Sequence, residues 1–182
     1  MRRRLNMILW IIVIAMILMI VSLLLINNRI LRYSFGGLFM FVFMGFVIAL
    51  SANMYNHYGM SKETTVQHKQ IYSAAPANVP VGMLITKKIE NNHYIMMFKD
   101  SADDQTARVH FVPDKNNVLA SLKKSANYKK INSNTAQVVT KTTKWQYNSE
   151  LMSWLFKFKE EDHLVKITHT VEIPNNWKIV NK

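Results

Sequence analysis

The chain has 182 residues, with 23 lysines and arginines against 11 aspartates and glutamates, and a formal net charge of +12. It contains no cysteine, which excludes disulfides, thiol catalysis, cysteine-ligated zinc, iron–sulfur clusters and a lipid-modified cysteine. All the acidic residues lie beyond residue 54, so an apolar segment precedes a polar one. The length allows one soluble domain and a small addition.

The apolar N-terminal segment predicts a hairpin of two membrane-spanning helices. After a basic tail at residues 1–4, residues 5–26 carry no charge, and a helix of that length covers the hydrocarbon core of about 30 Å. A short basic link at residues 27–34 follows. Residues 35–58 then supply a second apolar helix and its exit from the membrane. Only helices or closed barrels satisfy the backbone in lipid, so two spanning helices are expected.

A cleaved signal peptide is the competing interpretation of the first apolar run. Its basic start fits, but the run is longer than the usual apolar region of about 7–15 residues, and no small-x-small cleavage site precedes Asn27. A second apolar run follows at once, which favours two spans. Neither apolar run, residues 5–26 or residues 35–54, contains a charged residue or a histidine, which argues against a proton relay, ion pathway or voltage sensor.

A row of residues at four-residue spacing, several of them small, runs along one side of the second predicted helix. The row consists of Gly37, Phe41, Gly45, Ala49 and Asn53. The step from Gly45 to Ala49 allows close helix approach. We expect this row to pack against the first helix around Ala15 and Ser22. Homo-oligomerisation through Gly45 and Ala49 is the alternative.

The positive charges that flank the two predicted spans give nearly equal support to the two possible orientations in the membrane. Arg2, Arg3 and Arg4 favour a cytoplasmic domain, whereas Arg29 and Arg32 in the link favour an external one. Translation from Met7 would remove the first three arginines and leave the link dominant.

The first part of the soluble half predicts short strands and one short helix. Two prolines interrupt residues 74–80, and Pro113 ends a strand on which Ala107, Val109 and Phe111 share one face while Arg108 and His110 share the other. Expected strands are 62–72, 83–89, 94–98 and 106–112, and the expected helix is 118–124.

The last third alternates apolar and polar residues with a period of two. This pattern predicts strands at 136–147, 154–159 and 164–173, with a turn at 160–163. Strands joined by short turns predict that residues 62–182 form a small mainly β domain, either an antiparallel sheet or a partial barrel, with one short helix. The expected apolar anchors are Trp145, Trp154, Phe156 and Trp177.

The sequence offers no catalytic, cofactor-binding or metal motif. It has no glycine-rich phosphate loop, no nucleophile elbow and no two histidines at i+4. His163 and His169 could share a face and bind a metal, but surface or hydrogen-bonded histidines are the preferred interpretation. Similarly, the Asp100, Asp103 and Asp104 loop lacks calcium-loop spacing, so a solvated turn is preferred. We therefore expect no catalytic, cofactor or metal residues and no enzymatic activity.

The excess of lysine is spread along the domain in pairs such as residues 87–88, 123–124 and 129–130. Nucleic-acid binding requires a focused basic patch with interleaved aromatic residues, so it is not expected. Diffuse charge suffices for attraction to anionic lipid or to an anionic envelope polymer.

Several segments resemble a family of uncharacterised small two-pass membrane proteins of Gram-positive bacteria. They are Asn28-Arg29, Leu31-Arg32-Tyr33, Gly36-Gly37, His57-Tyr58-Gly59-Met60, Lys141-Thr142-Thr143-Lys144-Trp145, Trp154-Leu155-Phe156 and residues 174–177. The resemblance implies no catalytic residues. It also implies that family members begin directly with the apolar run, and Arg2, Arg3 and Arg4 are a departure from that pattern. The resemblance slightly favours a soluble domain on the external side of the membrane.

Together these features predict a two-pass protein of the cell membrane that presents a small β domain at the membrane surface. The domain would act as a non-catalytic binding or accessory module for an envelope or membrane-protein partner. The alternative is a membrane-anchored enzyme whose site uses His110, His169 or the loop from Asp100 to Asp104.

Overall fold

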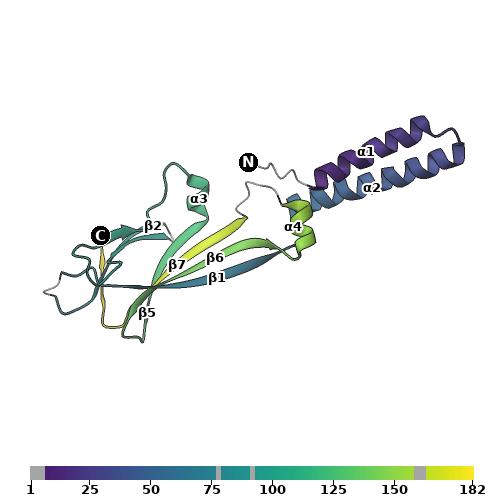
Figure 1. Cartoon of the computed structure of the whole chain (residues 1–182). Coiled ribbons are helices and arrows are strands. Elements are labelled where there is room, and N and C mark those ends of the chain that lie inside the picture. The colour runs from purple at the N-terminus through teal and green to yellow at the C-terminus, as the bar shows by residue number, and fades with distance from the viewer. Residues whose placement is uncertain (1–6, 77–78, 91–92, 158–162) are drawn as a thin grey trace. The chain divides into compact units, whose positions relative to one another are not determined.

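A computed structural model describes residues 7–76, 79–90, 93–157 and 163–182 of the chain (Figure 1). Its elements fall into two compact units. The first combines Met1–Lys62 with Trp145–His163, and the second combines Glu63–Lys144 with Leu164–Lys182. The expected soluble domain was residues 62–182 without interruption; instead, residues 145–163 group with the N-terminal helices.

The first unit contains the predicted helical hairpin, formed by α1 (Met7–Leu25) and α2 (Arg29–Asn56). α2 begins inside the segment expected to be the link, because the side chain of Asn28 caps it by accepting from the backbone N–H groups of Ile30 and Leu31. Arg32 Nε donates to the carbonyl oxygen of Ile26 at 2.7 Å and closes the short turn between the helices. The expected link at residues 27–34 is therefore mostly helical.

The seam between α1 and α2 uses a different glycine from the one expected. Ala15 and Ser22 are buried, as predicted, but a Cβ on Gly45 would meet nothing within 4 Å. At Gly36, by contrast, a Cβ would lie 2.7 Å from Leu23 Cδ2. The prediction for Gly45 is wrong because four residues advance about 400°, which is about 40° more than one full turn. A row at this spacing therefore winds around the helix and moves away from the line of contact with α1.

A short helix replaces the strand expected at residues 154–159. α4 (Glu150–Phe156) starts at Ser149, whose hydroxyl accepts from the backbone N–H of Met152 at 3.2 Å. This cap outweighs the alternation of Trp154 and Phe156, which suggested a strand. Residues 158–162, including the rest of that strand and most of the expected turn, lie outside the described residues.

The second unit is built on an eight-stranded sheet with the order β1-β6-β7-β5-β3-β2-β8, and with β4 paired to β3. A further helix, α3 (Val118–Leu122), falls within the expected helix. The strands are β1 (Met60–Ile71), β2 (Met83–Glu90), β3 (His93–Phe98), β4 (Arg108–His110), β5 (Lys124–Ile131), β6 (Ala136–Tyr147), β7 (Leu164–Pro174) and β8 (Lys178–Asn181). Both β1 and β6 run on into the first unit.

The predicted helical hairpin followed by a mainly β domain is confirmed, but the sheet is mixed rather than purely antiparallel. The pairs β2–β3 and β6–β7 are antiparallel as expected, whereas β2–β8, β3–β5 and β5–β7 are parallel. The parallel pairs involve β5 and β8, which the sequence did not reveal. The sequence of β5, Lys-Ser-Ala-Asn-Tyr-Lys-Lys-Ile, has no alternation to mark it as a strand.

The core of the second unit lies on one side of this sheet and includes Leu84, Met96, Phe98, Val171 and Ile173. Trp177 packs against this core, as expected for an anchor. A Cβ on Gly82 would lie 2.2 Å from Trp177 Nε1, so only glycine lets the indole approach so closely.

The other three expected anchors lie in the first unit and differ in how far they are buried. Phe156 is buried, whereas Trp154 is 54% exposed and is not a core residue. Trp145 is partly buried, with the ring of His57 4.3 Å from its own.

Candidate functional site

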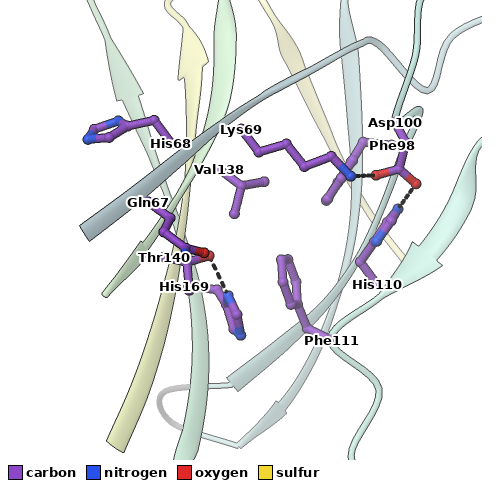
Figure 2. Close-up of a pocket in the computed structure, with 10 residues that line it drawn as sticks. All are labelled: Gln67, His68, Lys69, Phe98, Asp100, His110, Phe111, Val138, Thr140 and His169. Carbon is purple, nitrogen blue, oxygen red and sulfur yellow. Dashed lines mark hydrogen bonds and ion pairs between the residues drawn. The ribbon is translucent and has the colours of Figure 1, made fainter. Parts of the chain in front are cut away.

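The second unit holds a cavity of about 520 Å³ that opens between strands from distant parts of the sequence (Figure 2). Its walls come from β1, from the end of β3 and the residues after it, from the end of β4, and from β6 and β7. The lining residues are Gln67, His68, Lys69, Phe98, Asp100, His110, Phe111, Val138, Thr140 and His169.

Backbone geometry at Phe111 shapes the cavity. Phe111 has a φ of 62°, in the left-handed region that a bulky residue rarely adopts. The break in strand geometry lets His110 and Phe111 both line the cavity, whereas regular alternation would place them on opposite faces. Phe111 and Val109 therefore do not share a face as predicted, and Val109 is 51% exposed.

Two contacts hold Phe111 in this conformation. His93 Nε2 donates to the carbonyl oxygen of Phe111 at 2.7 Å, and the rings of Phe111 and His169 stack at 4.6 Å. A left-handed backbone at a non-glycine residue costs about 1–3 kcal/mol and persists only where the surroundings compensate. In Figure 2 the Phe111 ring stands between two groups of polar side chains.

The first polar group consists of Lys69, Asp100 and His110. Lys69 Nζ donates to Asp100 Oδ1 at 2.5 Å, and His110 Nε2 lies 3.5 Å from Asp100 Oδ2, which is too long for a strong hydrogen bond. The His110 ring stacks on Phe98 at 3.9 Å and with an interplanar angle of 4°. The Phe98 ring therefore supports one face of the imidazole, while the Nε2 edge of the imidazole points to the Asp100 carboxylate.

The charge states in this group follow from these contacts. The hydrogen bond from Lys69, with smaller contributions from nearby positive charge, holds the pKa of Asp100 below its usual value. Burial lowers the pKa of His110, against the attraction of Asp100. At neutral pH we therefore expect an ion pair of Lys69 and Asp100 beside a neutral imidazole.

The second polar group centres on His169 and Thr140, which are direct cross-strand neighbours in the antiparallel pair β6–β7. Thr140 Oγ1 lies 3.0 Å from His169 Nδ1, and this contact is a consequence of the register. Burial, followed by electrostatic interactions with Lys124 and His93, lowers the pKa of His169, so its ring is also neutral at neutral pH.

The acidic loop divides into residues with different roles. Asp100 faces the cavity, whereas Asp104 Oδ2 accepts from the backbone N–H groups of Asp100 and Ser101 at 3.1 Å each and fixes the turn. Asp103 is exposed. His163 belongs to the first unit, where its ring meets that of Tyr147 at 5.7 Å. Within the described part of the chain, no three His, Asp or Glu side chains are grouped closely enough to hold a metal ion.

The cavity thus brings together three residues that the sequence singled out, Asp100, His110 and His169, and adds residues for which no sequence signal existed. Lys69 and Gln67 lie on a predicted strand, but their sequence gives no reason to place them beside residues 100–111. The left-handed backbone of Phe111 also has no sequence signature, since glycine or asparagine would normally mark such a position.

A family model described as "Domain of unknown function (DUF4811)" matches residues 28–182. The matched range includes α2, the whole sheet and every residue that lines the cavity. No curated protein and no solved structure matches the chain. The resemblance of the sequence to an uncharacterised family is therefore confirmed.

Proposed function

Since this chain belongs to the DUF4811 family, we propose that it is a two-pass membrane protein whose mainly β unit binds a ligand or partner in the cavity around Phe111. α1 and α2 are both long and apolar enough to cross a bilayer. Their apolar side chains are largely exposed away from the seam, with Ile30 and Phe41 more than three-quarters exposed. Core helices of a soluble domain would bury such surfaces, so lipid is the environment that fits them.

The strained backbone of Phe111 is the observation that carries the binding proposal. Backbone strain at a bulky residue costs stability, and it is concentrated in proteins at functional sites. Here the strain directs an aromatic ring into a cavity between two polar groups, an arrangement typical of ligand sites. The cavity volume of about 520 Å³ suits a small molecule or one unit of a polymer.

Ligand-dependent stabilisation tests this proposal. The full chain in detergent would be screened by thermal shift against small molecules and fragments of anionic envelope polymers. A compound that raises the Tm of the unsubstituted protein should do so much less for Lys69→Ala and His169→Ala, because binding stabilises only a chain that still forms the site. Lys141→Ala, which removes an exposed lysine outside the cavity, is the matched control. Equal stabilisation of all four proteins would contradict the proposal.

Catalysis in the same cavity is a second candidate function, because Asp100, His110 and His169 all line it. Neutral histidines near neutral pH are suited to general base chemistry. The non-catalytic interpretation is preferred, since Thr140 and His169 are ordinary cross-strand neighbours and His110 lacks a short hydrogen bond to Asp100. Turnover of a bound compound that disappears in both His110→Gln and His169→Gln would favour the enzyme instead.

We further propose that the mainly β unit faces the external side of the membrane. Arg29 and Arg32 at the turn between the helices favour a cytoplasmic turn, which places both ends of the hairpin outside. Residues 2–4, whose arginines favour the reverse, lie outside the described residues. A cysteine introduced as Asn134→Cys should react with a membrane-impermeant maleimide in intact cells. Reaction only after cell lysis would place the unit inside.

A further inference from the structure

The short helix α4 in the first unit presents an exposed apolar face. At about 100° per residue, Leu151 and Trp154 lie about 60° apart on one side of the helix. They are 60% and 54% exposed, respectively. The opposite side carries Phe156, which is buried, and Met152, whose Sδ would lie 2.9 Å from a Cβ on Gly59. α4 therefore has apolar residues on both sides, and its outer face has no covering within the described residues.

The position of α4 relative to the two apolar helices is fixed within the unit. Met152 contacts Gly59, only three residues beyond the end of α2. The backbone N–H of Asn148 donates to the carbonyl oxygen of Gly59 at 2.9 Å, which ties the start of α4 to the same point. α4 also contacts α1, and Figure 1 places it beside the start of that helix. α4 thus lies at the end of the hairpin where α1 begins and α2 ends.

Other amphipathic aromatic residues gather at this end of the hairpin. Trp10 lies in the first turn of α1 and is about half exposed. Tyr55 near the end of α2 and Tyr58 just beyond it are exposed. Tryptophan and tyrosine concentrate at the boundary between hydrocarbon and water, where a ring can contact lipid while its polar atom reaches water. The chemistry of this end of the hairpin therefore matches that boundary.

We propose that α4 lies in the membrane–water interface, with Leu151 and Trp154 inserted among the lipid headgroups and upper acyl chains. Trp10, Tyr55 and Tyr58 complete an aromatic belt at that end of the hairpin. This inference rests on the proposed insertion of α1 and α2 in the membrane. The occupant assigned to the outer face of α4 is lipid, because α4 contacts α1, whose apolar side chains are exposed along its length. A docked protein is the competing occupant.

The absence of cysteine from the sequence permits a direct test. Single-cysteine variants of the full chain, Leu151→Cys and Trp154→Cys, would carry an environment-sensitive dye in vesicles of phosphatidylcholine and phosphatidylglycerol. Leu38→Cys, on the exposed surface of α2, reports insertion of the hairpin, and Asn134→Cys, in the turn between β5 and β6, reports water. Aqueous iodide and a nitroxide attached to lipid near the headgroup serve as the two quenchers.

We expect the dyes at positions 151 and 154 to emit at shorter wavelength than the dye at position 134, and to be quenched by the nitroxide rather than by iodide. If position 38 lies in lipid while positions 151 and 154 behave like position 134, α4 is not at the interface, although the hairpin is inserted. If iodide quenches position 38, the membrane proposal itself fails. Hydrogen exchange of the α4 amides shows whether either cysteine variant disrupts the helix. If one does, the dye on the other variant reports the location of α4.

Discussion

At the residue scale, the feature that departs furthest from sequence expectation is the left-handed backbone of Phe111. A single φ of 62° turns two consecutive side chains, His110 and Phe111, toward one cavity. The same residue is held by the hydrogen bond from His93 and by the stack with His169. The cavity therefore depends on local strain that more distant residues compensate.

Substitutions at Phe111 should reverse the usual order of alanine and glycine. Both remove the ring, but glycine adopts a φ of 62° without strain, so we expect Phe111→Gly to be more stable than Phe111→Ala by about 1 kcal/mol. At Val109, in the ordinary strand geometry of β4, alanine should be the more stable by a similar amount. Chemical denaturation of the four variants measures both differences. The same order at both positions would contradict this account of Phe111.

The two partly buried histidines of the cavity should make the protein less stable in mild acid. Burial lowers the pKa of His110 and of His169 below the ordinary value of about 6.5. Between the folded and unfolded pKa values the unfolded chain binds more protons, so stability is complete above about pH 6.5 and falls as the pH drops below it. Unfolding measured at about pH 7.5 and about pH 5 should show this loss.

The variant His110→Gln,His169→Gln provides the control for that pH dependence. With both rings removed, the loss of unfolding free energy between the two pH values should shrink. The lowered pKa values of Asp100 and Glu172 affect stability only at lower pH, since unfolded carboxylates titrate near 4. An undiminished loss in the double variant would assign the acid sensitivity to other groups.

At the element scale, a capping residue decides the structure of the segment after β6. Residues 154–159 alternate as a strand would, yet Ser149 begins a helix that includes Trp154. Likewise, Asn28 starts α2 within a segment that appeared to be a polar link. Alternation over a few residues is a weak signal, and a well-placed side-chain oxygen can outweigh it.

Removing the cap of α4 should destabilise that helix selectively. Ser149→Ala deletes the acceptor for the backbone N–H of Met152, which costs about 0.5–2 kcal/mol. Ser153→Ala, which deletes a hydroxyl inside the same helix, should have little effect or a slight benefit because alanine favours helices. Amide hydrogen exchange in α4 measures the local stability of each variant. Equal protection in both variants would show that the cap is unimportant.

At the scale of the whole molecule, two units of different chemistry share one chain. The first unit is held by the seam between two apolar helices, and the second by a core under a mixed sheet. In detergent the helices keep an apolar environment and internal backbone hydrogen bonds, whereas the sheet loses its core when denaturant is added.

Denaturant should therefore unfold the full chain in detergent in two steps. The strand signal should be lost first, and the helical signal should persist to higher denaturant concentration, because the micelle continues to stabilise α1 and α2. Circular dichroism followed across the titration separates the two signals. A single transition in which both signals are lost together would show that the two units unfold as one.

Features that depend on composition and on local periodicity could be predicted from the residues alone. Uncharged runs long enough to cross a membrane predicted α1 and α2, β-branched residues indicated β1, and alternation predicted β4, β6 and β7. Turn-forming residues near 91–92 indicated the antiparallel pair of β2 and β3. Each of these signals lies within a few residues of the element that it specifies.

The identity of neighbouring strands and the side-chain contacts between them could not be predicted in this way and are known from the folded structure. β5 enters the sheet between β3 and β7 although its sequence is polar and irregular, because hydrogen bonds to β7 along its whole length hold it there. Lys69 and Asp100 form an ion pair across 31 positions of the chain, and Phe111 reaches His169 through a backbone turn that its sequence disfavours. Such contacts depend on long-range register and on compensated strain, which no local pattern of residues encodes.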